Sequence, residues 1–360
     1  MKTGKTIVEL AQEIQRQSEN KRDFIVPTEK TLMAVRENDA LTFEFGDQAL
    51  AIGDTAHVQI GQHAGIPKPY YDRMKAEQPV LLAANVNTWL HANPTRQMVR
   101  TLDGKARAFL SDKYRPLDNE QLAEAVLPVL ADLNAEIISC EVTEKRLYIK
   151  ATDKSISGRL PVMGSGIHKF QKDRVLHPLI VIGNSEIGHG SLSVDDGTFD
   201  EWCLNGAIFA RNLRKTHVGQ RYAQFEDERV YAMLTDQTRA INDAAFWSTL
   251  RDVVKGSFEQ AKFNALIDKI ADTQSQPLEG DVVKIIEVTS KTFGFNDGER
   301  KSVLDHLIKG GDLSRFGLYN AVTRTAEDLT DYDRASEFEK DGGVIAMMPK
   351  MDWELLAKAA

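Results

Sequence analysis

The stretch HPLIVIGNSEIGHGSLSV, residues 177 to 194, decides the fold. An apolar run from Leu179 to Ile182 leads into a segment with three glycines, after which apolar and polar residues alternate. This order predicts two strands joined by a turn, because glycine supplies the positive φ angles and bulges that such turns need. We expect Asn184 and Ser185 to bond to the turn backbone, and its exposed N–H groups to suit a phosphate contact.

A second hairpin is predicted at RQMVRTLDGKARAFLSDKYR, residues 96 to 115, where Asp103-Gly104 separates two alternating runs. Asp-Gly in this position is a strong hairpin signal. The alternation gives the second strand a basic face and an alanine face, made of Lys105 with Arg107 and of Ala106 with Ala108.

Further strands are predicted on both sides of the turn at residues 143 to 145 and around the turn dipeptide Asn205-Gly206. Between these hairpins an amphipathic helix is expected from Leu117 to Leu133, with Asp118 as its N-cap. Residues 95 to 222 therefore predict a central antiparallel sheet with an inserted helix, which is an α+β domain.

Two flanking regions complete the predicted α+β fold. Residues 1 to 94 predict an N-terminal helical and hairpin layer packed on the core, with a turn at Gly46-Asp47 and a helix capped by Thr55. Residues 223 to 360 are helix-periodic and predict a mainly helical C-terminal region.

The composition is that of a globular protein, with 42% hydrophobic and 27% charged residues among 360. The net charge of -8 excludes a uniformly basic nucleic-acid binder, but residues 145 to 174 hold eight basic residues against two acids. The charged N-terminus and the lack of a long apolar run predict a cytoplasmic protein that does not contact membranes. Cys140 and Cys203 are expected to be buried thiols.

The basic residues of the middle region, interleaved with aromatic ones, favour single-stranded DNA or RNA as the partner. Phosphates require positive charge and unstacked bases require an aromatic face. The alternative to a nucleic-acid site is that the basic residues form an ordinary solvated surface and that the aromatic residues belong to the core. The predicted phosphate contacts are Arg100, Arg107, Lys113, Arg115, Arg211, Arg214 and Lys215, and the predicted stacking residues are Tyr114 and Tyr148.

Two other functions remain open. Ser185, Glu186 and His189 could serve as nucleophile, acid and base of a hydrolase or nuclease, with or without a metal, although the GxSxG pattern is absent. No zinc, phosphate-loop or dinucleotide motif is present, so neither a metal nor a cofactor is expected. The acidic C-terminal region could instead bind a protein partner as a regulatory or counter-defence factor, and a homo-oligomer is also possible.

Four phrases resemble a family of phage and plasmid proteins known as domain of unknown function 932. They are RTLDGKARAFLSDKYRPLDN (100 to 119), HPLIVIGNSEIGHGSLSV (177 to 194), WCLNG followed by RKTH (202 to 217) and LYNAVTRTAEDLTDYDRASEFEKDGG (318 to 343). The resemblance implies a setting in mobile-element DNA metabolism within a bacterial host. Strand annealing in recombination or replication is the role expected of a single-stranded nucleic-acid binding protein in that setting. The resemblance supplies no catalytic residues. In the last phrase we expect Arg324 and Arg334 to form solvated helix ion pairs with the surrounding acids.

Overall fold

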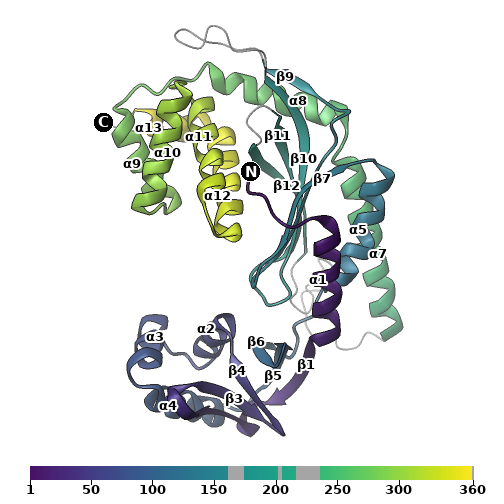
Figure 1. Cartoon of the computed structure of the whole chain (residues 1–360), viewed down its shortest axis with the longest axis vertical. Helices are drawn as coiled ribbons and strands as arrows, with labels where there is room; N and C mark the ends of the chain where they lie inside the picture. Colours follow the sequence, from purple (N-terminus) through teal and green to yellow (C-terminus); the bar gives the residue numbers. More distant parts are fainter. Residues whose placement is uncertain (161–173, 202–204, 216–235, 359–360) are drawn as a thin grey trace.

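Two six-stranded sheets organise the chain in the computed structural model, which describes residues 1–160, 174–201, 205–215 and 236–358 (Figure 1). The first sheet comes from the N-terminal part of the chain and the second from its middle, and helices dominate the C-terminal part. The α+β class predicted from the sequence is therefore confirmed.

The N-terminal sheet has the strand order β1-β5-β6-β4-β3-β2. Its strands are β1 (Arg22–Pro27), β2 (Thr31–Val35), β3 (Leu41–Phe45), β4 (Gln48–Ile52), β5 (Arg96–Leu102) and β6 (Lys105–Ser111). Helices α2 (Asp54–His63), α3 (Lys68–Glu77) and α4 (Pro79–Ala92) pack with it, and the 3-10 turns η1 (Thr28–Lys30) and η2 (Glu37–Asp39) join the strands. These elements share one apolar core and are called the N-terminal unit here.

The hairpin predicted at Asp103-Gly104 is confirmed, since both residues have positive φ angles, of 53° and 74°, and connect β5 to β6. The two faces of β6 are also as predicted, because Ala106 and Ala108 are buried while Lys105 is exposed. However, β5 pairs with β1 and β6 pairs in parallel with β4, so the hairpin belongs to the N-terminal sheet. Turn chemistry specifies only the pairing within a hairpin, and the outer neighbours are chosen by burial.

The central sheet has the strand order β12-β11-β10-β8-β7, and β9 pairs with β10 beside this path. All its pairings are antiparallel. Its strands are β7 (Glu136–Val142), β8 (Leu147–Thr152), β9 (Gly158–Leu160), β10 (Arg174–Asn184), β11 (Leu192–Asp200) and β12 (Asn205–Lys215). The hairpins predicted around residues 143 to 145 and within 177 to 194 are confirmed.

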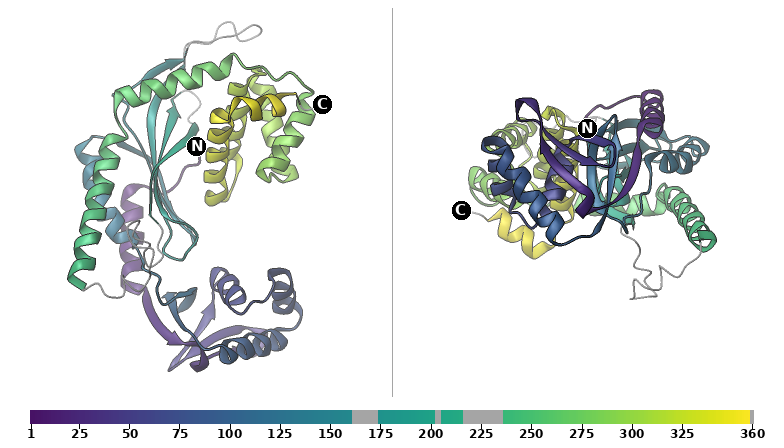
Figure 2. Two further views of the ribbon diagram at one scale, coloured as in Figure 1. Left: turned by 180° about the vertical axis from the view of Figure 1, so that it is seen from behind. Right: turned by 90° about the horizontal axis from the view of Figure 1, so that it is seen from below.

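Helices cover both faces of the central sheet (Figures 1 and 2). One face packs on α1 (Ile7–Asn20), α5 (Asn119–Asp132) and α7 (Asp236–Gly256). On the other, α11 (Arg315–Asp328) and α12 (Tyr332–Met347) pack on β12, and α8 (Gln260–Gln274) packs on β9. Helices α9 (Val282–Phe293), α10 (Asp297–Gly310) and α13 (Lys350–Ala357) form an outer layer, in which α10 packs on α11 and α9 contacts α10 and α13. The predicted C-terminal helices are present, and the start of that region, residues 223 to 235, lies outside the described residues.

The second face of the sheet is partly polar although it is buried. On β8, Leu147 and Ile149 point to the core with α1, α5 and α7, and Tyr148 and Lys150 point to α12. The Nζ of Lys150 lies 2.6 Å from Oε2 of Glu339, and neither side chain is exposed to solvent. Helix α12 therefore covers charged as well as apolar groups of the sheet.

Two local predictions are wrong. Gly53, not Thr55, is the N-cap of α2, and Thr55 lies in the first turn with its hydroxyl against His189. Asn205-Gly206 is not a turn but the start of β12, where Gly206 pairs with Phe199. An added Cβ at Gly206 would lie 2.9 Å from Cδ2 of Leu179, so a larger residue here would require that side chain to shift.

None of the helices in the described part of the chain combines the length and the apolar character needed to span a membrane. Cys140 is buried as predicted, and Cys203 lies outside the described residues.

The packing of α12 on the central sheet can be tested at Gly343, where an added Cβ would lie 1.8 Å from the carbonyl oxygen of Ile208 in β12. Gly343→Ala should lower the free energy of unfolding by about 2 kcal/mol, because the helix must move away from the strand. The control is Gly256→Ala at the end of α7, where the nearest atom to an added Cβ is 3.8 Å away. This substitution should raise the free energy of unfolding by up to about 1 kcal/mol, because alanine favours the helix more than glycine does. Urea unfolding compares them, and a Gly343→Ala protein as stable as wild type would contradict this packing.

Candidate nucleic-acid interface at the junction of the two sheets

The segment from Ser185 to Ser191, called the junction loop here, connects β10 to β11 and lies against the N-terminal unit. Gln59 of α2 donates from Nε2 to the carbonyl of Ile187 at 2.8 Å, and the hydroxyl of Thr55 lies 2.8 Å from Nε2 of His189. Ile187 itself is fully buried. The loop is therefore an internal contact between the two sheets and not a simple surface turn.

Glycine and serine shape this loop as the sequence predicts. Gly188 and Gly190 have φ angles of 83° and 138°, which other residues rarely adopt. The hydroxyl of Ser185 donates to the carbonyl of Lys145 at 2.8 Å and accepts from the N–H of His189 at 3.0 Å. Gly183 has an ordinary φ angle, so only two of the three glycines serve the backbone conformation.

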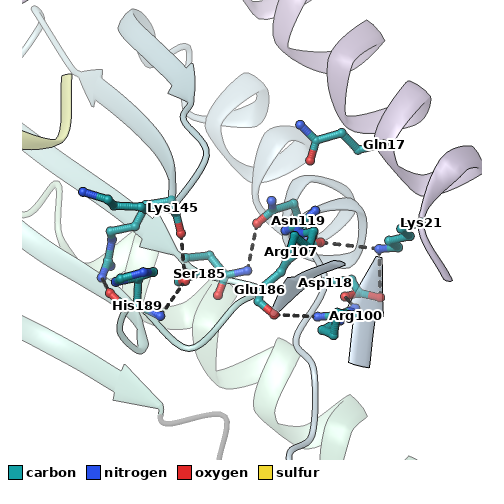
Figure 3. Close-up of polar contacts among 12 residues, drawn as sticks. Gln17, Lys21, Arg100, Arg107, Asp118, Asn119, Lys145, Ser185, Glu186 and His189 are labelled. Carbon is teal, nitrogen blue, oxygen red and sulfur yellow. Dashed lines mark hydrogen bonds and ion pairs between the residues drawn. The ribbon is translucent and has the colours of Figure 1, made fainter. Parts of the chain in front are cut away.

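Glu186 is the most heavily bonded residue of the loop (Figure 3). Its side chain is 3% exposed, with Oε2 2.9 Å from Nη2 of Arg107 and Oε1 3.4 Å from Nζ of Lys21. Oε1 also accepts from the N–H of Asn119, the first residue of α5, at 2.8 Å. Asp118 occupies the N-cap position of α5 but makes no capping bond, so Glu186 supplies the negative charge that this helix end favours.

A second ionic group, centred on Arg100, lies directly beside it. Arg100 is 2% exposed and contacts Asp23 at 2.8 Å, Asp118 at 2.9 Å and the carbonyl of Glu186 at 2.8 Å. Burial alone would lower the pKa of Arg100, but Asp118 and Asp23 raise it above its ordinary value. Burial also opposes the charge of Asp118, yet Arg100 and Lys21 hold the pKa of Asp118 below its usual range. Arg100 is thus a structural cation and is not accessible to a phosphate.

The three residues of the hydrolase alternative do not form a nucleophile and base pair. The hydroxyl of Ser185 is bonded to backbone groups, the ring of His189 contacts Thr55, and the carboxylate of Glu186 is enclosed by cations. Partial burial lowers the pKa of His189, and Lys145 adds to this effect. Within the described residues no group of three or more His, Cys, Asp or Glu side chains is placed to hold a metal ion.

Of the two predicted stacking residues, Tyr148 is buried and Tyr114 is half-buried. Tyr148 is 4% exposed, and its hydroxyl donates to Oδ1 of Asp333 in α12 at 2.9 Å. The hydroxyl of Tyr114 donates to the carbonyl of Ser185 at 3.3 Å. Burial raises the pKa of both phenols. The ring of Tyr148 therefore offers no face on which a base could stack, and that of Tyr114 is partly covered.

The other predicted phosphate contacts are dispersed. Arg115 pairs with Asp243 of α7, and Nζ of Lys215 lies 3.9 Å from the ring centroid of Phe246. Lys113 is exposed just after the end of β6. Arg214 is exposed, and its Nε donates to the hydroxyl of Ser191 at 3.0 Å. Arg211 lies in β12, and its side chain is outside the described part of the structure.

Arg107 lines a cavity of about 320 Å³ between α1, the β5–β6 hairpin and the β7–β8 turn, called the junction pocket here. Three further basic residues line the same cavity, namely Lys105, Lys145 and Arg146. The sequence identifies these residues as part of its basic stretches. It does not show that they share one site, because nothing in it indicates that the two hairpin turns meet. Their position at hairpin turns, where side chains reach solvent, is the signal that could have indicated them.

Arg146 links the junction pocket to the junction loop. Its Nη1 donates to the carbonyl of His189 at 2.9 Å and its Nη2 to the carbonyl of Ser191 at 3.2 Å. An added Cβ on Gly190 would lie 1.9 Å from Nη1, so this position of Arg146 depends on the glycine. Ser191 also binds Arg214 through its hydroxyl. Five cations therefore follow one another across the junction, and we call them the basic strip: Lys105, Arg107, Lys145, Arg146 and Arg214.

No family model, no curated protein and no solved structure matches this chain. The resemblance to the domain of unknown function 932 family rests on its four sequence phrases and stays a prediction.

Substitution of Glu186 tests the role of the junction. Glu186→Gln leaves Arg107 and Lys21 without their shared carboxylate, so the free energy of unfolding should fall by about 3 kcal/mol. Glu144→Gln is the matched control, because Glu144 is exposed at the rim of the same cavity, and it should change stability by less than about 0.5 kcal/mol. Urea unfolding followed by circular dichroism gives both values. Equal stability of the two variants would show that Glu186 does not hold the junction.

Proposed function

We propose that the protein binds single-stranded nucleic acid through the basic strip, with one phosphate group seated in the junction pocket. The observation that carries this proposal is the convergence of four cations from two distant hairpins on one cavity. Contacts between lysine or arginine and the phosphate backbone supply most of the affinity of proteins that bind nucleic acid without regard to sequence.

Among the described residues four acidic side chains line the junction pocket; three of them are already paired with cations, and Glu144 is exposed at the rim. Glu186 is already neutralised by Arg107 and Lys21. Glu13 and Asp103 both pair with Arg16, at 2.9 Å and 2.8 Å. Lys105 and Lys145 are exposed, and within the described structure neither ammonium group has a hydrogen bond or an ion pair. These two lysines are the groups best able to exchange water for a phosphate.

Arg146 adds a donor that the protein leaves unused. Its Nε is buried and has no hydrogen-bond partner within the described residues, while its two other nitrogens bond to the junction loop. A buried donor without a partner carries a cost of about 1–3 kcal/mol. A ligand oxygen that reached this donor would remove that cost.

The shape of the site favours a single strand over a duplex. A flexible strand can turn one phosphate into a cavity of this size, whereas the phosphates of a duplex are held on a rigid outer surface. Because Tyr148 is buried and Tyr114 is half-buried, binding should depend on phosphates more than on base stacking. Such contacts do not distinguish DNA from RNA.

The proposal agrees with the mobile-element setting that the family resemblance implies, in which single strands arise during recombination and replication. The overall charge of -8 is compatible with it, because exposed charges beyond about 10 Å are screened at 0.1 M salt. The contacts of Ser185, Glu186 and His189 give no comparable support to the hydrolase alternative.

Binding of a labelled single-stranded oligonucleotide, measured by fluorescence anisotropy over a salt series, tests the proposal. The Lys105→Ala/Lys145→Ala protein should bind roughly tenfold more weakly, and the slope of log K against log salt should fall by about 0.7 for each lysine. Neither lysine takes part in the ionic groups around Glu186 and Arg100, so the fold should be retained.

The matched control is Lys284→Ala/Lys301→Ala, which removes two exposed lysines of α9 and α10 far from the strip. It should bind as wild type does. Binding that is independent of salt, or that falls equally in both double variants, would contradict a role for the basic strip.

A further inference from the structure

A second cavity lies on the C-terminal side of the central sheet, between α10, α11 and the first residue of β10, and is called the helical pocket here. Its volume is about 380 Å³, at the lower end of the range for small-molecule sites. Its polar lining holds three cations, one histidine, one carboxylate and one amide: Arg174, Lys309, Arg324, His306, Asp312 and Asn320.

Arg174 is held in place but keeps most of its donors. Its guanidinium lies over the ring of Phe316, with Cζ 5.0 Å from the centroid, and its Nη1 is 3.3 Å from Oδ2 of Asp200. A guanidinium has five N–H groups in a rigid fork. The single ion pair leaves the other donors for a ligand, and the aromatic contact reduces the entropy lost when one binds.

Arg324 departs from the prediction made for it. Arg334 pairs with Glu299 and Glu337 as expected, but Arg324 is exposed and forms no ion pair with a described residue. The neighbouring carboxylate of Asp328 is taken by His306, at 2.8 Å, and by the hydroxyl of Ser302.

Arg324 lies one helical turn after Asn320 in α11, so both side chains face the same cavity. Asn320 is 9% exposed, and its amide nitrogen donates to the carbonyl of Phe316 at 2.8 Å. The cavity wall thus holds a fixed cation on one side, Arg174, and an exposed cation on the other, Arg324, with the amide beside it.

We infer that the helical pocket is a binding site for a small molecule that carries a phosphomonoester. Among the described residues the lining has three cations and one carboxylate, and Arg174 also pairs with Asp200 behind it, so an excess of positive charge remains, which favours a phosphomonoester dianion over a carboxylate or a phosphodiester. Arginine is also the residue whose geometry best fits the oxygens of a phosphate. The site does not depend on the nucleic-acid proposal, because it uses none of the basic strip and is lined by residues of β10, α10, α11 and the loop between these helices.

Isothermal titration of the full chain with glycerol 3-phosphate at pH 7.5 and constant ionic strength tests this inference. Saturable binding with one ligand per chain is expected, and glycerol alone should give none. Arg324→Ala should weaken binding roughly tenfold, and Arg324→Lys should weaken it less, because lysine keeps the charge but loses the fork. Circular dichroism of each variant confirms that it is folded.

Two controls separate this site from others. Lys301→Ala removes an exposed cation of α10 that does not line the cavity, and Lys105→Ala/Lys145→Ala removes cations of the basic strip. Both should bind glycerol 3-phosphate as wild type does. No saturable binding, or an equal loss in Arg324→Ala and either control, would overturn the inference. A single-stranded oligonucleotide that displaces the ligand from the wild type but not from the Lys105→Ala/Lys145→Ala protein would also overturn it, because the ligand would then occupy the junction.

Discussion

The arrangement of the two sheets depends on the buried carboxylate of Glu186. A carboxylate removed from water costs several kcal/mol unless charged partners and hydrogen bonds replace its hydration. Here Arg107 of β6, Lys21 after α1 and the first N–H of α5 do so together. These groups belong to three separate elements, so they can satisfy the carboxylate in only one relative position. The contact that neutralises the charge therefore also specifies how the N-terminal unit sits on the central sheet, and it brings the cations of the junction pocket to one place.

The opposite face of the central sheet follows the same physical rule. Lys150 and Glu339 are fully buried and 2.6 Å apart, and the ammonium group also lies 4.7 Å from the ring centroid of Tyr332. Tyr148 reaches Asp333 of the same helix. Acidic groups of α12 thus complement a sheet face that carries polar and basic residues. In the sequence, Tyr148 and Lys150 alternate with apolar residues. A strand whose polar face is covered by a helix and a strand whose polar face meets solvent have the same pattern, so the sequence alone does not distinguish them.

Much of the secondary structure could be predicted, and much less of the site. Asp103-Gly104 indicated its hairpin correctly, since the turn depends on residues that adjoin one another. Arg107 and Arg214 lie at the junction of the two sheets, whereas Arg100 is a buried structural cation. Lys105, Lys145 and Arg146 could not be assigned, because they belong together only after two distant hairpins meet. Charge and residue type are visible in a sequence, but the solvent exposure that makes a cation a ligand for phosphate is not.

By itself the sequence determined the local conformations: the positive φ angles at Gly188 and Gly190, the two faces of β6 and the helices that follow Asp236. These features depend on sterics and on burial patterns within a few residues of the chain. Only the tertiary structure decided which sheet the β5–β6 hairpin joins, which charges are buried in pairs and which cations line the two cavities. The physical reason is that both strand pairing and desolvation are set by segments far apart in the chain, and the energy of a charge depends on the neighbours that replace its water.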